Sequence, residues 1–150
     1  KNITTPDLII GRGLYMKSNK VTRLSHFITF DSLELINCRE FRKLMFSGFC
    51  PPHQATLFGP GVRSFNSSYS KKYKLSSDLN YFLGLTKFQN LSISVLPINF
   101  VCMGADGVSA KSTLQRLKEV ISIYFSYYGI YFIVPIFMRY LRRISLVIKK

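Results

Sequence analysis

The stretch Val120-Ile-Ser-Ile-Tyr-Phe-Ser-Tyr-Tyr-Gly-Ile-Tyr-Phe-Ile-Val-Pro-Ile-Phe-Met138 contains nineteen consecutive residues without a formal charge. A helix rises ~1.5 Å per residue, so this window has about the length needed to cross the ~30 Å hydrocarbon core of a bilayer. Lys111, Arg116 and Lys118 precede the window, and five Lys or Arg residues follow Met138. Long basic side chains at the ends of a membrane helix extend to the lipid headgroups. We therefore expect one C-terminal transmembrane helix with an apolar span over 120–138, followed by a basic tail over 139–150.

The residues expected to form this membrane anchor are apolar side chains within the window and arginines just after it, which fix its depth. They are Ile121, Phe125, Ile130, Phe132, Ile133, Ile136, Phe137, Arg139, Arg142 and Arg143. Four tyrosines lie inside the window, although tyrosine prefers the membrane interface. A buried β-hairpin that turns at Tyr128-Gly129 is an alternative, because β-branched and aromatic residues suit a sheet. A surface for a partner protein is a third interpretation.

The rest of the chain predicts an α+β fold, with a small basic mixed α/β portion over 1–108 and a helical segment over 109–150. The apolar run Leu8-Ile9-Ile10 predicts a strand that stops at Gly11-Arg12-Gly13, and alternation over 21–30 predicts a second strand. Asp31 and Glu34 have the spacing of a capping box. We expect that box to begin a helix whose inner face carries Leu35, Cys38, Phe41 and Met45.

The middle of the chain is punctuated by Pro, Gly and Ser from 51 to 77, which predicts an exposed loop. Residues 91–95 then alternate between apolar and polar side chains, and an apolar run continues after Pro97. Proline cannot donate a backbone hydrogen bond, so we expect an edge strand that is interrupted or bulged at Pro97.

The charge of the chain is strongly positive, with 21 Lys and Arg against 7 Asp and Glu and a net charge of +14. Such an excess favours anionic partners, either nucleic acid or phospholipid headgroups. In one region, 63–74, basic residues are interleaved with tyrosines, and a second basic region covers 12–23. Lysine neutralises phosphates and tyrosine stacks on unpaired bases. The residues expected to contact RNA or another anionic surface are Arg12, Lys17, Lys20, Arg63, Tyr69, Lys71, Lys72, Tyr73 and Lys74.

One string, Gly104-Ala-Asp-Gly-Val-Ser-Ala-Lys111-Ser-Thr113, lies between an apolar run and a helical pattern. It resembles the phosphate-binding loop of P-loop kinases, in the Gly-x-Asp-Gly-x-Gly-Lys-Ser-Thr form of thymidylate-kinase-like proteins, and that resemblance implies a nucleotide site. The chain departs from the family pattern, because Ala110 replaces the glycine before the lysine and six residues rather than five separate Gly104 from Lys111. The sequence favours instead the start of a helix, with a cap supplied by Asp106, Ser109 or Ser112.

Residues that could support catalysis or hold a metal are few and scattered. The histidines are His26 and His53, the three cysteines are widely spaced, and the acidic residues are isolated from one another. A tetrahedral metal site needs four ligands, and acid–base catalysis needs a base beside its reacting partner. We expect no enzyme activity, no metal and no cofactor.

These features together favour a non-enzymatic structural subunit of a large mitochondrial assembly, anchored in the inner membrane, such as a respiratory-chain or ATP-synthase complex. The absence of Trp and the abundance of Phe, Tyr, Ile, Ser and Lys are typical of A/T-biased organelle genomes. The alternative is a mitochondrial ribosomal protein that binds rRNA through 63–74 and buries its aromatic C-terminus. Expected partners are other protein subunits and either anionic lipid or rRNA, with no small-molecule substrate.

Overall fold

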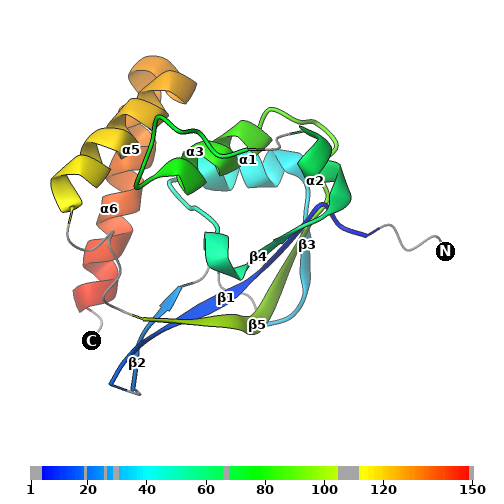
Figure 1. Ribbon diagram of the computed structural model, residues 1–150. Helices are drawn as coiled ribbons and strands as arrows, with labels where there is room; N and C mark the ends of the chain where they lie inside the picture. The colour runs from blue at the N-terminus through cyan, green and yellow to red at the C-terminus, as the bar shows by residue number, and fades with distance from the viewer. Residues whose placement is uncertain are drawn as a thin grey trace.

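The computed structural model describes residues 5–18, 20–25, 27–28, 31–65, 68–104 and 112–148, without the side chains of 23, 63–65 and 143–148. Its main helices lie together on one face of a mixed β-sheet, as Figure 1 shows. The hydrophobic core lies between these two layers. It joins sheet residues such as Leu8 and Ile93 to helix residues such as Phe41 and Phe82.

The sheet is organised around β1 (Leu8–Lys17), which pairs in parallel with β5 (Ile93–Gly104). On the other side of β1, β4 (Thr56–Phe58) pairs antiparallel with its first half and β2 (Lys20–Ser25) with its second half. The strand β3 (Glu34–Ile36) extends the sheet by pairing antiparallel with the beginning of β5. The mixed α/β portion expected from the sequence is therefore present.

Strand β1 continues through Gly11 and Gly13, so the prediction that it stops there is wrong. A side chain from β5 covers each glycine: a Cβ atom on Gly11 would lie 2.5 Å from the ring of Phe100, and one on Gly13 would lie 2.5 Å from the terminal methyl of Met103. The glycines thus make room for larger side chains on the neighbouring strand. The register between β1 and β5 shifts around Pro97, where the sequence predicts a bulge.

The first helix, α1 (Cys38–Phe46), begins later than predicted. The expected capping box at Asp31 and Glu34 is wrong, because the chain from Glu34 is extended and pairs with β5. The box is formed instead by Asn37 and Glu40, each of which accepts a hydrogen bond from the other's backbone N–H.

The inner face predicted for this helix is largely confirmed. Cys38, Phe41 and Met45 are buried against the core. Leu35, expected on the same face, lies on β3 and is 74% exposed. Leu35 is therefore an exposed apolar side chain on the sheet layer.

The region 51–77 is not one exposed loop, contrary to the prediction. It contains a short 3-10 helix η1 (His53–Ala55), strand β4 and helix α2 (Pro60–Phe65), and it leads into helix α3 (Ser77–Leu85). The prolines at 51 and 52 are buried. The proline and glycine residues of this region separate short elements, of which β4 forms an edge of the sheet beside β1.

The C-terminal part forms two helices, α5 (Thr113–Tyr128) and α6 (Ile133–Ile148), joined by the 3-10 turn η2 (Gly129–Phe132). One helical run of the described residues, Thr113–Arg142, is long and apolar enough to cross a membrane by length and composition. The run reverses at Gly129, whose φ of 55° and ψ of −132° suit glycine alone. The alternative of two strands is wrong, although a turn does lie at Tyr128-Gly129.

This pair of helices, which we call the helical hairpin, projects from the helix layer with its turn farthest from the sheet (Figure 1). Helix α5 packs on α3, and α6 packs against the end of α1. The contact with α1 is tight, because a Cβ atom on Gly48 would lie 2.5 Å from the backbone oxygen of Pro135. The ring of Phe46 also meets that of Tyr128 edge-on, with centroids 5.0 Å apart.

Candidate functional site

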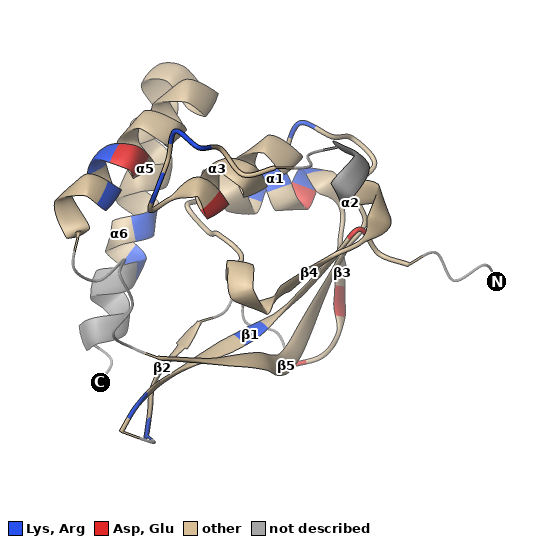
Figure 2. Ribbon diagram, in the orientation of Figure 1, with Lys and Arg blue, Asp and Glu red and all other residues tan. Residues whose placement is uncertain are grey.

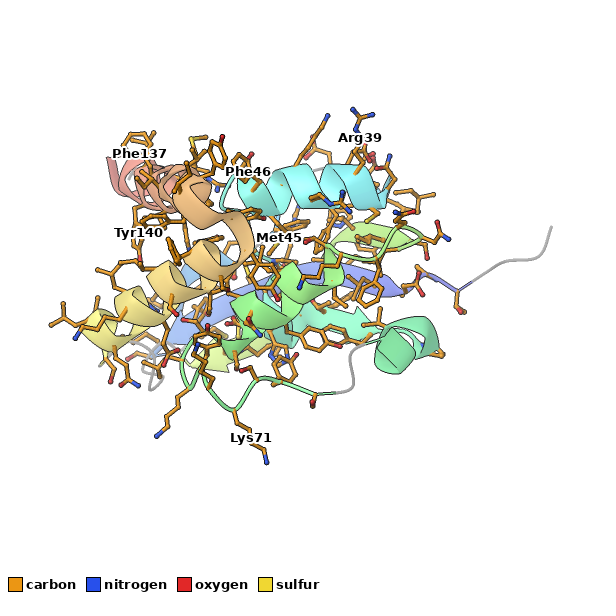
Figure 3. The ribbon with its side chains drawn as sticks, turned by 90° about the horizontal axis from the view of Figure 1, so that it is seen from above. Arg39, Met45, Phe46, Lys71, Phe137 and Tyr140 are labelled. Carbon is orange, nitrogen blue, oxygen red and sulfur yellow. The ribbon has the colours of Figure 1, made fainter. Side chains whose placement is uncertain are left out.

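The outer surface of the helical hairpin is apolar and exposed. We call it the apolar hairpin face; Ile130 is 77% exposed and Phe137 62% exposed. Figure 2 shows that the turn, the adjoining half of α5 and the start of α6 carry neither acidic nor basic residues, and Phe137 extends outward in Figure 3. The members of this face are Ile121, Phe125, Ile130, Tyr131, Ile133, Val134, Phe137 and Met138. Five of the predicted anchor residues belong to it.

The inner surface of the hairpin is packed on the domain. Val120, Ile123 and Tyr124 of α5 are buried, and Phe132 and Ile136 pack partly buried against the same core. Only 22% of the most apolar window is buried within the structure. The hairpin is therefore attached by one face and leaves the other uncovered by the described part of this chain.

The predicted depth-setting arginines contact protein groups in this structure. Nη1 of Arg139 lies 3.5 Å from the Tyr124 hydroxyl, to which it donates a hydrogen bond. Arg142 donates to the backbone oxygen of Ser47 and lies over the ring of Phe49. Arg139 therefore joins α6 to α5 and Arg142 joins α6 to the segment after α1, whereas the side chain of Arg143 lies outside the described residues.

A carboxylate that the sequence analysis did not single out holds α5 in place. Glu119 accepts hydrogen bonds from the backbone N–H groups of Lys74 at 3.1 Å, Leu75 at 2.9 Å and Ser76 at 2.9 Å. These donors lie just before α3, where backbone N–H groups have no partner within the helix. A contact across more than forty residues leaves no local signal, which is why the sequence did not reveal it.

The same contact brings a basic segment beside the hairpin. Lys71, Lys72 and Lys74 are exposed on the segment that Glu119 holds against α5. Lys87, which follows α3, is also exposed, and its Nζ lies 5.0 Å from the centroid of the Tyr127 ring on α5. We call these four residues the lysine collar. Lys87 was missed by the sequence analysis because it lies outside any basic run.

The tyrosines predicted to stack on RNA bases are engaged with other parts of the domain. Tyr73 is only 8% exposed, and its hydroxyl lies 3.5 Å from that of Ser122. Tyr69 stacks on Tyr81 with ring centroids 4.6 Å apart. Burial raises the pKa of Tyr69 to about 12, and the charges of Tyr81 and Asp78 add to the rise.

The two predicted basic regions are not brought together. Lys17 and Lys20 are exposed where β1 turns into β2, at the end of the molecule opposite the hairpin turn (Figure 2). Arg12 is half-buried on β1, and the side chain of Arg63 lies outside the described residues. The structure thus places the lysine collar beside α5 on the helix layer, and Lys17 and Lys20 at the far end of the sheet.

The remaining candidate chemistry is metal binding and nucleotide binding. Within the described residues, no group of three or more His, Cys, Asp and Glu side chains could hold a metal ion. The P-loop-like string lies outside the described residues from 105 to 111, and α5 begins at Thr113 with Ser112 at the cap position but without a side-chain hydrogen bond. Comparison with protein-family models, curated proteins and solved structures gave no match.

Proposed function

We propose that this chain is a non-enzymatic structural subunit anchored to a membrane through its apolar hairpin face. The single observation that carries the proposal is the exposure of that face. Soluble monomers rarely leave a large group of neighbouring apolar side chains uncovered, and such surfaces mark contacts with membranes or partner proteins. The mitochondrial inner membrane and a large complex within it remain predictions from composition.

The charge of the molecule supports lipid as the partner. The apolar hairpin face is uncharged, whereas exposed lysines of the collar lie beside α5, with Lys74 near Glu119 and Lys87 over Tyr127 close to the turn. An apolar surface bordered by basic residues has the chemistry of a segment that enters the interface of an anionic membrane. A protein partner would not by itself account for the lysines.

Flotation of the purified full chain with lipid vesicles tests the proposal. The chain should float with the vesicles, and Ile130→Arg should leave most of it at the bottom of the gradient, because a charge within hydrocarbon is strongly unfavourable. Leu35→Arg is the matched control, because Leu35 is similarly exposed, at 74% against 77% for Ile130, but lies on the sheet layer. The control variant should float like the unmodified chain.

Two outcomes would contradict the proposal. The unmodified chain could stay at the bottom with every vesicle composition, or both arginine variants could float equally well. Either result would mean that the apolar hairpin face does not enter lipid.

The binding of rRNA is a second candidate function, supported by the exposed Lys17, Lys20, Lys71, Lys72 and Lys74. Lysine contacts with phosphates give an affinity that falls steeply with salt. Retention on ribosomal particles that is lost on ribonuclease treatment, without any flotation, would favour this function over the membrane anchor.

A further inference from the structure

We propose that the helical hairpin enters a single, anionic leaflet from one side, with the lysine collar at the headgroups, and that it does not cross the bilayer. This inference rests on the proposed membrane function and specifies the surface that the hairpin binds. It replaces the transmembrane helix expected from the sequence by a helix pair whose two ends stay on the same side.

The first argument is length. Tyr124 is buried in the core and the hydroxyl of Tyr127 donates a hydrogen bond to the backbone oxygen of Asn80, so the turn and the exposed side chains beside it are the part of the hairpin that can enter lipid. The turn η2 has four residues and the hydrocarbon core is ~30 Å thick, so the inserted end of the hairpin is far too short to cross it and stays within one leaflet. The chain then returns through α6, and basic residues are present on both helices near their bases, Arg116 and Lys118 on α5 and Arg139 on α6.

The second argument is the attachment of the inner surface. A straight helix over 120–138 would require the turn at Gly129 to open and would pull Tyr124, which has no exposed surface, out of the core. It would also detach Arg142 from Phe49. Each fully buried large side chain contributes about 1.5–3 kcal/mol to folding, so the folded domain opposes this extension.

The third argument is the position of the lysine collar. The two segments that carry the collar lysines, just before and just after α3, lie on the helix layer. They are on the side from which the hairpin turn projects (Figures 1 and 2). In the view from above, Lys71 extends from the edge of the molecule opposite Phe137, so the collar borders the helix layer away from the outer side chains of α6 (Figure 3). Lysines at such a surface are attracted to anionic lipid, so the collar and the inserted tip act on the same leaflet.

The topology is tested by tagging thiols in sealed vesicles that carry the reconstituted full chain. Cys102 is exposed on β5, and Ser145→Cys adds a thiol near the end of α6. The half-buried Cys50 is replaced by alanine to reduce background tagging. A membrane-impermeant maleimide polymer should give molecules with both thiols tagged or neither, because both lie on one side. A majority of singly tagged molecules would show a spanning helix and overturn the inference, while the membrane function would stand.

The lipid preference is tested with the paired substitution Lys71→Ala and Lys72→Ala. Each lysine near an anionic surface strengthens binding about fivefold, so partition into phosphatidylserine-containing vesicles should fall about 25-fold. The pair Lys17→Ala and Lys20→Ala removes the same charge at the opposite end of the molecule and should change partition less than about twofold. Partition into vesicles of phosphatidylcholine alone should be weak for all three proteins.

Three results would overturn this part of the inference. Equal partition into anionic and neutral vesicles would show that the lysine collar does not bind anionic headgroups. Equal losses of partition for the two lysine pairs would show that the position of the collar does not matter. Failure of every form to float, combined with binding to single-stranded RNA that Lys71→Ala and Lys72→Ala weaken, would remove the proposed function as well.

Discussion

The guanidinium of Arg142 lies over the aromatic ring of Phe49, with 3.4 Å between its Cζ atom and the ring centroid. The same side chain donates to the backbone oxygens of Ser47 and Met138. One arginine therefore connects α6 to the segment that follows α1. This connection keeps the second helix of the hairpin on the domain.

We expect Arg142→Ala to destabilise the domain by about 2 kcal/mol, the sum of a cation–π contact and hydrogen bonds to two backbone carbonyls. Arg142→Lys should recover only part of this loss, because an ammonium group lacks the planar surface that stacks on the ring. Urea unfolding of the three proteins measures the difference. Equal stability of the Lys variant and the unmodified chain would show that charge alone holds α6.

Glu119 gives a second test of how the hairpin is held. Glu119→Ala leaves three backbone donors without their acceptor and should cost about 3 kcal/mol, and Glu119→Gln should cost less because one acceptor oxygen remains. Hydrogen exchange at the amides of 74–76 should accelerate in both variants. Gln115→Ala is the control, because its amide reaches Glu119 only at 3.4 Å, and it should leave these amides protected.

The two glycines of β1 should differ in their tolerance of a methyl group. Gly11→Ala places Cβ against the ring of Phe100 and should cost about 1–3 kcal/mol, as overpacking does. In Gly13→Ala the one close approach is to the terminal methyl of Met103, which can rotate away, while Val101 lies at an ordinary contact distance of 3.5 Å, so the cost should be less than about 1 kcal/mol. Thermal unfolding of both variants measures the contrast, and similar losses would contradict it.

The pKa of Tyr69 predicts a loss of stability in strong base. In the unfolded chain this phenol ionises near pH 10, whereas in the folded chain burial raises its pKa to about 12. Below pH 10 both states keep the proton, and between pH 10 and 12 the unfolded state alone releases it, so stability falls as the pH rises. Urea midpoints over this range should fall less steeply for Tyr69→Phe than for the unmodified chain. Identical slopes would show that Tyr69 titrates normally.

Local patterns in the sequence predicted part of the fold. Cys38, Phe41 and Met45 are spaced as one helical face, and that face is buried. The start of the helix was misplaced because two acceptor-and-glutamate pairs satisfy the same capping pattern, and pairing with β5 decides between them. Likewise, Gly11 and Gly13 look like a strand end until the side chains of β5 that cover them are known.

The candidate site was predicted in its parts but not in its arrangement. The apolar window could be recognised because it holds nineteen consecutive uncharged residues. A turn at Tyr128-Gly129 was also predicted. Helical structure was predicted for this window, but its reversal at Gly129 was foreseen only in the alternative of two strands, since the window is rich in residues that suit either. The approach of Lys71 and Lys72 to α5 depends on Glu119, and the chain offers no periodicity that links them.

The parallel pairing of β1 with β5 also governs the order in which the chain can fold. Leu8 pairs with Ile93, so the central strands are separated by more than eighty residues. Such distant pairing makes folding slow, because a long loop must close before the contact is gained. During synthesis, β1 and β2 emerge as an incomplete sheet that waits for β5, and α5 and α6 follow at once. The helical hairpin is therefore made after β5, so it leaves the ribosome only after the strands on which its domain depends have been synthesised.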